Sequence, residues 1–133
     1  MTESNCETGH PTLKKIFALV DDLFFAEKIR ATGKVVGIPV EILNSGEELI
    51  HRIGREVPSL VIVDLNGTTT TPMQTIQKIK SDPQFAGFPL LGFFSHVQED
   101  LKKRALQSGC NTVLPRSQFS KELVRILRES SNQ

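Results

Sequence analysis

Short apolar runs alternate with amphipathic segments along this chain, and the two patterns predict different elements. The run Leu60 to Val63 is continuous and rich in β-branched residues, which is typical of a strand buried on both faces of a parallel sheet. Four further short runs have a similar character. Together they predict strands at residues 15–20, 40–43, 60–63, 88–94 and 111–114.

Between these runs, apolar residues recur at helical spacing and predict five helices. Ser45 with Glu48 three residues later has the pattern of a capping box, and Gly37 suits the end of a helix. The buried helix positions are expected at Phe25, Ile29, Thr32 and Val36; Leu49, Ile50, Ile53 and Val57; Met73, Ile76 and Ile79; Val97, Leu101 and Ala105; and Phe119, Leu123, Ile126 and Leu127. Phe24, Phe25, Phe93 and Phe94 are expected in the core.

Strict alternation of strands and helices with short connections predicts a parallel sheet covered by helices on both faces. We therefore expect an α/β fold of the flavodoxin-like, doubly wound (βα)5 class, with a five-stranded parallel sheet in the order 2-1-3-4-5. One domain is expected over residues 13–130, between an N-terminal tail at 1–12 and a C-terminal tail at 131–133.

Charge and composition narrow the class of protein. The 133 residues include 16 basic and 15 acidic side chains, so the overall charge predicts no attraction to nucleic acid or to an anionic membrane. No apolar run is long enough to span a bilayer, and the polar N-terminus is unlike a signal peptide. A cytoplasmic location is expected. Cys6 and Cys110 form no metal or redox motif, which favours reduced thiols.

Acidic residues follow two of the predicted strands. Asp21 and Asp22 come after the first strand and Asp64 ends the third. In the expected strand order these strands are neighbours, so the carboxylates meet at one edge of the sheet, where ligands of such folds bind. Like charges this close repel, and a divalent, oxygen-preferring ion such as Mg²⁺ would remove the conflict. The alternative is that Asp64 only caps the segment after it.

Three motifs resemble the receiver domains of two-component response regulators. They are L-V-D-D at residues 19–22, L-V-I-V-D-L at 60–65 and S-G-C-N-T-V-L-P-R at 108–116, and the resemblance extends over residues 14–129. It implies that Asp64 accepts a phosphoryl group from a histidine kinase or phosphotransfer protein. It also implies that Asp22, Asp64 and the carbonyl of Asn66 hold Mg²⁺, with Asp21 helping through water.

The same resemblance implies an output surface made of the fourth helix, the fifth strand and the fifth helix, which would bind a downstream protein or a second copy in a homodimer. The basic run Lys102 to Arg104 lies on that helix, and its other interpretation is a solvated helix face. No helix-turn-helix pattern is present, so DNA binding is not expected.

The chain departs from the family pattern at the residues that transmit the signal. Arg116 stands where the family has a lysine, and Ser117 replaces the usual proline. Phe94 lies at the position of the switch hydroxyl, with Ser95 one residue late as a displaced hydroxyl, and Val113 replaces the aromatic switch residue. These departures favour a divergent receiver or a pseudo-receiver that binds partners without phosphorylation.

Two enzymatic or cofactor alternatives remain. The segment Asp64 to Thr68 resembles the D-x-D-G-T motif of haloacid-dehalogenase-type phosphatases, but Asn66 replaces the general acid and no later acidic pair follows. A flavin site is suggested by fold analogy alone, and the acidic loop at Asp21 and Asp22 would repel its phosphate. We expect a protein that is not an enzyme.

Overall fold

The computed structural model describes residues 15–68, 70–95 and 99–131, and its centre is one parallel sheet. The strands are β1 (Ile16–Leu19), β2 (Val40–Leu43), β3 (Leu60–Asp64), β4 (Leu90–Phe94) and β5 (Thr112–Pro115). They pair in the order β2-β1-β3-β4-β5, which confirms the predicted fold class and topology. The predicted tail at residues 1–12 lies outside the described residues.

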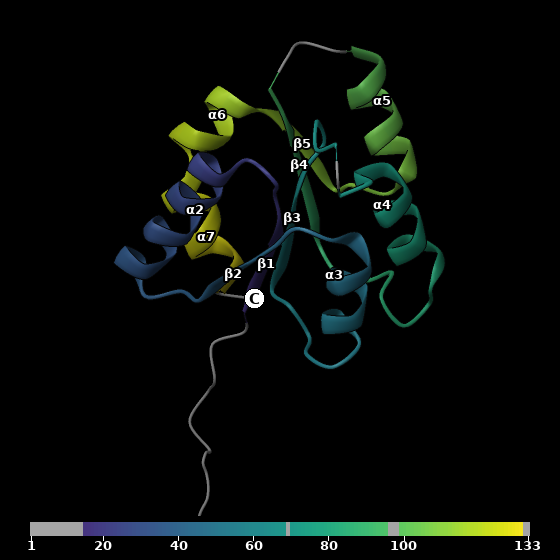
Figure 1. Ribbon diagram of the computed structural model, residues 1–133, viewed down its shortest axis with the longest axis horizontal. Coiled ribbons are helices and arrows are strands. Elements are labelled where there is room, and N and C mark those ends of the chain that lie inside the picture. Colours follow the sequence, from purple (N-terminus) through teal and green to yellow (C-terminus); the bar gives the residue numbers. More distant parts are fainter. Residues whose placement is uncertain (1–14, 69, 96–98, 132–133) are drawn as a thin grey trace, which may run out of the picture.

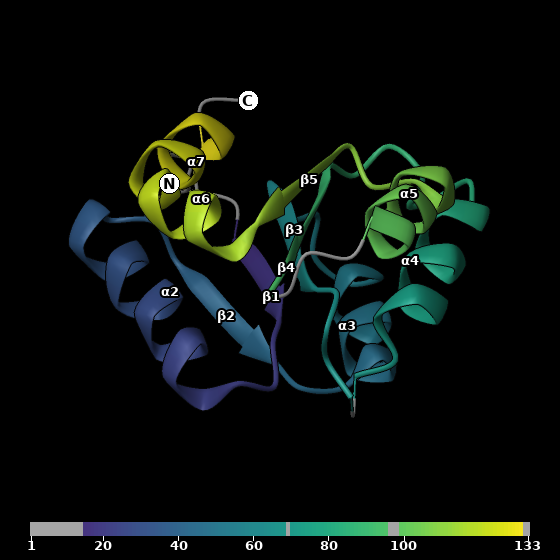
Figure 2. The ribbon, with the colours of Figure 1, turned by 90° about the horizontal axis from the view of Figure 1, so that it is seen from above.

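Helices cover both faces of the sheet (Figures 1 and 2). In the described part of the chain they are α2 (Leu23–Val36), α3 (Gly46–Ile53), α4 (Pro72–Ser81), α5 (Glu99–Ser108), α6 (Arg116–Lys121) and α7 (Leu123–Ser131). Helices α2, α6 and α7 pack on one face, and α3, α4 and α5 pack on the other. None of these helices is long and apolar enough to cross a lipid bilayer.

The two cores follow from the alternation of side chains along each strand. Phe17 and Leu19 of β1 point to the layer of α3, α4 and α5, whereas Ile16 and Ala18 point to the layer of α2, α6 and α7. Because both faces are covered, β1 and β3 are buried throughout. This explains why the strands read as continuous apolar runs.

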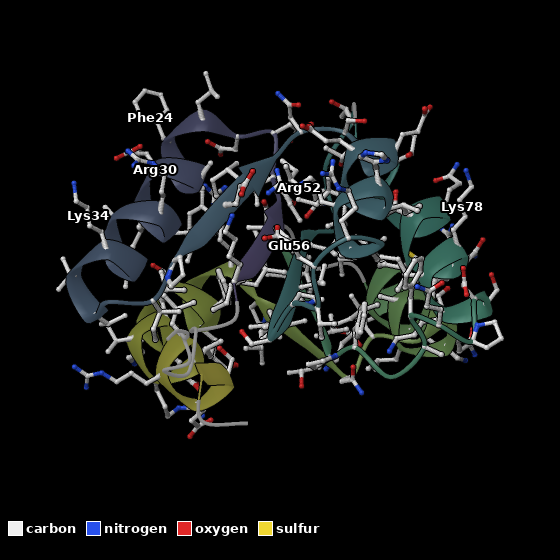
Figure 3. The ribbon with its side chains drawn as sticks, turned by 90° about the horizontal axis from the view of Figure 1, so that it is seen from below. Phe24, Arg30, Lys34, Arg52, Glu56 and Lys78 are labelled. Atoms are coloured by element: carbon white, nitrogen blue, oxygen red, sulfur yellow. The ribbon has the colours of Figure 1, made fainter. Side chains whose placement is uncertain are left out.

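Three phenylalanine rings pack together in the core between the sheet and the layer of α2, α6 and α7. Phe93 of β4 stacks on Phe119 of α6 with ring centroids 4.8 Å apart, and Phe25 of α2 lies 5.0 Å from Phe93. Phe94 is buried as well, so three of the four predicted core phenylalanines are confirmed. Phe24 is 92% exposed and points away from the body of the protein (Figure 3), so its prediction was wrong. Successive helix residues are turned by about 100°, so only one of the two adjacent rings can face the sheet.

Two other predicted positions differ in the structure. Val57 is 57% exposed because α3 ends at Ile53 and does not carry the apolar stripe further. Near the end of α2, Gly33 is buried and Thr32 is not. The helix lies so close to β2 here that a Cβ at Gly33 would be 2.6 Å from Val40 Cγ2. This glycine lets the helix approach the edge strand closely.

The last predicted helix is two helices. It is interrupted at Glu122, which is the C-terminal cap of α6, so the described residues contain six helices where five were predicted. The break lets Phe119 of α6 and Leu123 and Leu127 of α7 enter the same core. Val97, predicted on the preceding helix, lies outside the described residues.

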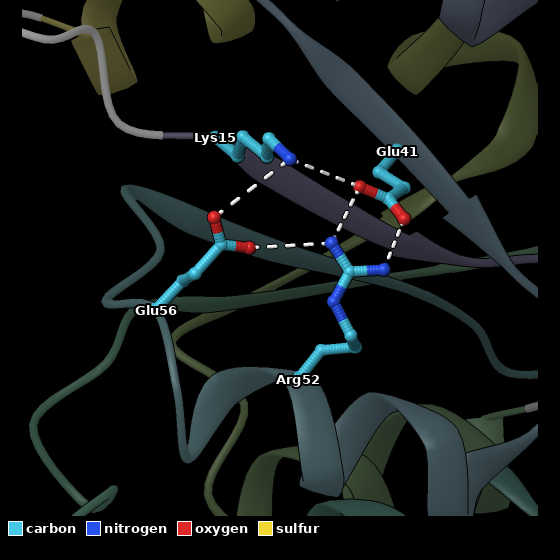
Figure 4. Close-up of polar contacts among 4 residues, drawn as sticks. All are labelled: Lys15, Glu41, Arg52 and Glu56. Atoms are coloured by element: carbon cyan, nitrogen blue, oxygen red, sulfur yellow. Dashed lines mark hydrogen bonds and ion pairs between the residues drawn. The ribbon is translucent and has the colours of Figure 1, made fainter.

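Charged side chains connect α3 to the edge of the sheet (Figure 4). Arg52 of α3 donates to Glu41 of β2 at 2.7 Å and to Glu56 at 3.2 Å, and Lys15 donates to Glu41 at 3.3 Å. The guanidinium carbon of Arg52 also lies 5.4 Å from the centroid of the Phe17 ring. These charges border the unpaired edge of β2 at the end of the sheet where β1 begins, and they would oppose pairing of this edge with another strand.

Candidate functional site

Asp64 is the last residue of the central strand β3, and its side chain is buried at the carboxyl edge of the sheet. Its pairing with Phe93 of β4 fixes the backbone, and the residue is only 5% exposed. The carboxylate Oδ1 accepts the backbone N–H of Asn66 at 2.9 Å. A carboxylate held rigidly in this position faces the crevice where ligands of doubly wound folds bind.

Asp21 and Asp22 reach the same edge from the neighbouring strand. The register of β1 and β3 aligns Leu19 with Val63, and Asp21 and Asp22 follow the paired part of β1 after one further residue. Asp22 is the N-cap of α2, and its Oδ1 accepts the N–H groups of Phe24 and Phe25 at 3.0 and 3.1 Å. Capping of this kind fixes both the start of the helix and the direction of the carboxylate.

Asp21 connects the end of β1 to the loop that follows Asp64. Its Oδ2 accepts the backbone N–H of Thr68 at 3.0 Å. Gly67 lies between these partners, and a Cβ there would be 2.4 Å from Thr70 Oγ1. A side chain at this position would have to displace the Thr70 hydroxyl, so glycine lets the loop fold closely over the acidic edge formed by Asp21, Asp22 and Asp64.

Arg116 supplies a positive charge to this edge. It is the first residue of α6, directly after β5, and its Nη2 donates to Asp22 Oδ2 at 2.9 Å. The guanidinium carbon lies 4.1 Å from the centroid of the Phe25 ring, within range of a cation–π contact. The contact with Asp22 joins residues 94 positions apart in the chain. The motifs in the sequence place this arginine at the site but do not indicate its partner.

The pKa shifts of the two carboxyl groups run in opposite directions. Burial is the main cause that raises the pKa of Asp64; the Asn66 N–H opposes it, the charges of Asp21 and Asp22 add to it, and Arg116 opposes it. The N–H of Phe25 and then the hydrogen bond from Arg116 lower the pKa of Asp22. The edge therefore holds one carboxylate that is poorly solvated and one that is well stabilised as an anion.

Asn66 has a role that the sequence did not indicate. The resemblance assigned its backbone carbonyl to a metal, whereas its side-chain Oδ1 accepts the N–H of Ser95 at 2.5 Å. This bond ties the end of β3 to the end of β4. Ser95 is exposed and follows the last residue of its strand.

The residues at the two predicted switch positions are part of the core. Phe94 ends β4 opposite Pro115, and Val113 of β5 lies opposite Gly92. Both side chains are buried in the layer of α3, α4 and α5. The end of β4 therefore carries a buried aromatic ring where the resemblance would place a hydroxyl.

Two threonines after Asp64 have unusual environments that sequence reasoning did not identify. Among the described residues, the Thr70 hydroxyl is the one buried side-chain polar atom without a hydrogen-bond partner. Thr71 has a positive φ of 45°, a left-handed conformation that is costly for a β-branched residue. The only signal in the sequence was the threonine-rich composition of this loop.

The side chains at this edge match Mg²⁺ in their chemistry. Carboxylates and a backbone carbonyl are the hard oxygen donors that this ion prefers, and Asp21, Asp22, Asp64 and Asn66 are the residues from which this edge would supply them. Over residues 15–68, 70–95 and 99–131, however, no three acidic, histidine or cysteine side chains are grouped closely enough to hold a metal ion. One carboxylate oxygen, Asp22 Oδ2, is already bonded to Arg116.

Sequence comparison finds distant relatives. No family model matches the chain. A protein of Leptolyngbya boryana described as "Uncharacterized 14.6 kDa protein in sodA1 3'region" is 22% identical over 114 residues, which cover 86% of this chain and 87% of that protein. The transcriptional activator protein ExaE of Pseudomonas putida is 31% identical over 74 residues, which cover 55% of this chain but only 33% of that longer protein.

Solved structures match over almost the whole chain. A CheY-like response regulator receiver domain protein of Methanospirillum hungatei JF-1 superposes with a TM-score of 0.77 at 16% identity, covering 91% of this chain and 95% of the other. The phosphorylated cyanobacterial phytochrome response regulator RcpA gives 0.74 at 22% identity, with 89% and 91% covered. The Mn²⁺-bound form of response regulator Rcp1 gives 0.71 at 18% identity, with 87% and 90% covered. The chain has the fold of the response regulator receiver domains.

Proposed function

We propose that this chain is a receiver domain of phosphorelay signalling in which Asp64 accepts a phosphoryl group. The donor is a histidine kinase or a phosphotransfer protein, and the output is a change in protein–protein contacts. The observation that carries the proposal is the position of Asp64, a buried carboxylate at the carboxyl end of the central strand with two further carboxylates and one guanidinium around it.

The chemistry assigned to Asp64 is nucleophilic. One carboxylate oxygen forms a bond to phosphorus while the bond from phosphorus to the donor's histidine nitrogen breaks, and the electron pair of that bond leaves with the imidazole. The N–H of Asn66 holds Oδ1, which orients Oδ2 as the attacking oxygen. Burial removes water from the carboxylate and would protect the product from hydrolysis.

Charge on the transferred group must be neutralised, and three groups are proposed to contact it. Arg116 would donate to the phosphoryl oxygens in place of the family's lysine, and a displaced Ser95 hydroxyl would replace the switch hydroxyl. A Mg²⁺ ion held by Asp22, Asp64 and the Asn66 carbonyl, with Asp21 acting through water, would supply Lewis-acid stabilisation of the phosphoryl group.

The proposed output surface comprises α5, β5 and the two last helices, α6 and α7. Leu106 on α5 and Val124 on α7 are exposed apolar side chains on this surface. Lys103 and Arg104 add exposed positive charge. A downstream protein or a second copy of the chain is proposed to bind here, in the cytoplasm.

The test is an amide NMR titration of the full chain with Mg²⁺ and then with beryllofluoride, a mimic of the phosphoryl group. Shifts centred on Asp22, Asp64 and Asn66 that disappear in Asp64→Asn are expected. Asp82→Asn, which changes an aspartate outside the acidic edge, is the matched control and should respond like the unchanged protein. A chain that shows no shift with either addition would contradict phosphorylation at Asp64.

A second candidate is a phosphorylation-independent interaction module. The observation that favours it is that Phe94 at the end of β4 and Val113 on β5 are both buried in the core. Neither of these two positions carries a hydroxyl or a mobile aromatic ring that could respond when the site is loaded. Shifts that remain confined to the acidic edge and do not reach α5 would support this candidate. Turnover of a generic phosphomonoester would instead support the phosphatase alternative, which the exchange of the general acid for Asn66 disfavours.

A further inference from the structure

The acidic edge already contains a cation, the guanidinium of Arg116. It is held from two sides, by the bond to Asp22 Oδ2 at 2.9 Å and by the face of the Phe25 ring at 4.1 Å. Phe25 is itself buried against Phe93 and Phe119, so the surface under the guanidinium is rigid. The planar group is thus fixed at the acidic edge by packing as well as by charge.

The bond from Arg116 matters because both carboxylate oxygens of Asp22 already accept hydrogen bonds. Oδ1 accepts two N–H groups at the start of α2, and Oδ2 accepts the guanidinium. An incoming divalent ion would therefore meet a carboxylate whose two oxygens are both engaged, and it would also meet a positive charge beside it.

We infer that Arg116 and the divalent ion compete for Asp22, so that the arginine is the resident counter-ion of the edge and sets how tightly a metal binds. This inference rests on the proposed metal site and adds to it the residue that controls its occupancy. A divalent ion takes Asp22 only when the guanidinium leaves both the carboxylate and the Phe25 ring.

The structure provides a place to which the guanidinium can move. A groove between α2 and α6 adjoins it, lined by Phe25, Lys28, Phe94, Ser95, Pro115, Arg116, Ser117 and Ser120. Ser120 Oγ of this groove already accepts a hydrogen bond from Lys28 Nζ, whereas the hydroxyls of Ser95 and Ser117 can accept the guanidinium N–H groups. Arg116 is the first residue of α6, so movement of its side chain would also perturb the start of that helix. Metal occupancy of the acidic edge would in this way be coupled to the proposed output surface.

The experiment measures Mg²⁺ affinity by calorimetry and by amide shifts on the full chain and on three variants. Arg116→Gln removes the competitor and should bind Mg²⁺ about tenfold more tightly or better, as expected for release of one charge-assisted hydrogen bond. Arg116→Lys keeps the charge but loses the planar stacking and the fork, so its affinity should lie between the two. Lys28→Gln removes a cation of the same groove that does not contact Asp22, and it should change the affinity less than about twofold.

Three results would overturn the inference. They are equal affinities of the unchanged chain and Arg116→Gln, no Mg²⁺ binding by either, and a gain in Lys28→Gln as large as that in Arg116→Gln. The last would mean that only the overall charge matters. Adding Asp22→Asn to Arg116→Gln should abolish the gain, which places the competition on that carboxylate.

Failure of the inference is distinct from failure of the proposed function. Phosphorylation of Asp64 is measured separately, by the mass of the intact chain after incubation with acetyl phosphate and Mg²⁺. A chain that is phosphorylated although Arg116→Gln binds Mg²⁺ no better keeps the function and loses the competition. If the chain is never phosphorylated but Arg116→Gln binds Mg²⁺ more tightly, the competition is supported and the proposed function is contradicted.

Discussion

Replacing Asp64 with asparagine should stabilise the folded protein at neutral pH. Burial raises the pKa of this carboxyl group above its ordinary value of 3.8, which means that folding disfavours its charged form. The stability associated with Asp64 is therefore fully present below the pKa of the unfolded chain, and it is lost as the pH rises through the higher pKa of the folded state. A neutral amide avoids this loss at pH values above the pKa of the folded state.

The contacts of Asp64 set the size of the effect. Asparagine keeps an oxygen that can accept the N–H of Asn66, so the bond at 2.9 Å survives. The variant also removes the repulsion from Asp21 and Asp22, which disfavours the charged form, and the opposing attraction of Arg116. The largest cause is the desolvation of one buried charge, and on that basis we expect a gain of about 1–2 kcal/mol in the free energy of unfolding.

The assay is urea unfolding followed by far-ultraviolet circular dichroism, because the chain has no Trp or Tyr for fluorescence. It is run near neutral pH and again at about pH 4, where the gain should shrink as Asp64 in the unchanged protein takes up a proton. Both proteins will lose stability in acid, since partners lower the pKa of Asp22 and Glu41, so the difference between variant and unchanged protein is the informative quantity.

A control and a contrary result complete this test. Asp100→Asn, at an exposed position on α5, should change stability by less than about 0.5 kcal/mol. A loss of stability in Asp64→Asn, or a gain of equal size at both pH values, would refute the reasoning that burial of the charge destabilises the fold. The expected result also means that the proposed phosphoacceptor is retained at a cost to stability.

Three further predictions concern packing and backbone, each measured by the same unfolding assay. Phe24→Ser should leave stability within about 0.5 kcal/mol, whereas Phe25→Ala should cost about 3–5 kcal/mol; similar losses would contradict the assigned phase of α2. Gly33→Ala should destabilise by about 1–2 kcal/mol despite the better helix propensity of alanine, because its Cβ would clash with Val40; a gain would mean that α2 does not approach β2 so closely. Thr71→Asn should stabilise by about 0.5–1 kcal/mol, since asparagine tolerates positive φ, and a loss would indicate that the threonine hydroxyl outweighs the strain.

The sheet and the residues at its carboxyl edge can be predicted from the sequence alone. A strand buried on both faces must be apolar throughout, so Leu60 to Val63 is visible as a strand without any knowledge of its neighbours. The polar residue that ends such a run must lie at the edge of the sheet. For this reason Asp64, and likewise Asp21 and Asp22 after β1, could be placed before any contact was known.

Only the tertiary structure decided the contacts among these residues and the limits of the helices. Arg116 and Asp22 meet because β5 and β1 end at the same edge, and no local pattern couples residues 94 positions apart. Periodicity gives the spacing of an apolar stripe but not its phase against the sheet, so Phe24 and Phe25 were indistinguishable. The break at Glu122 has the same origin, because packing of the rings and leucines, and not helix propensity, ends α6 there.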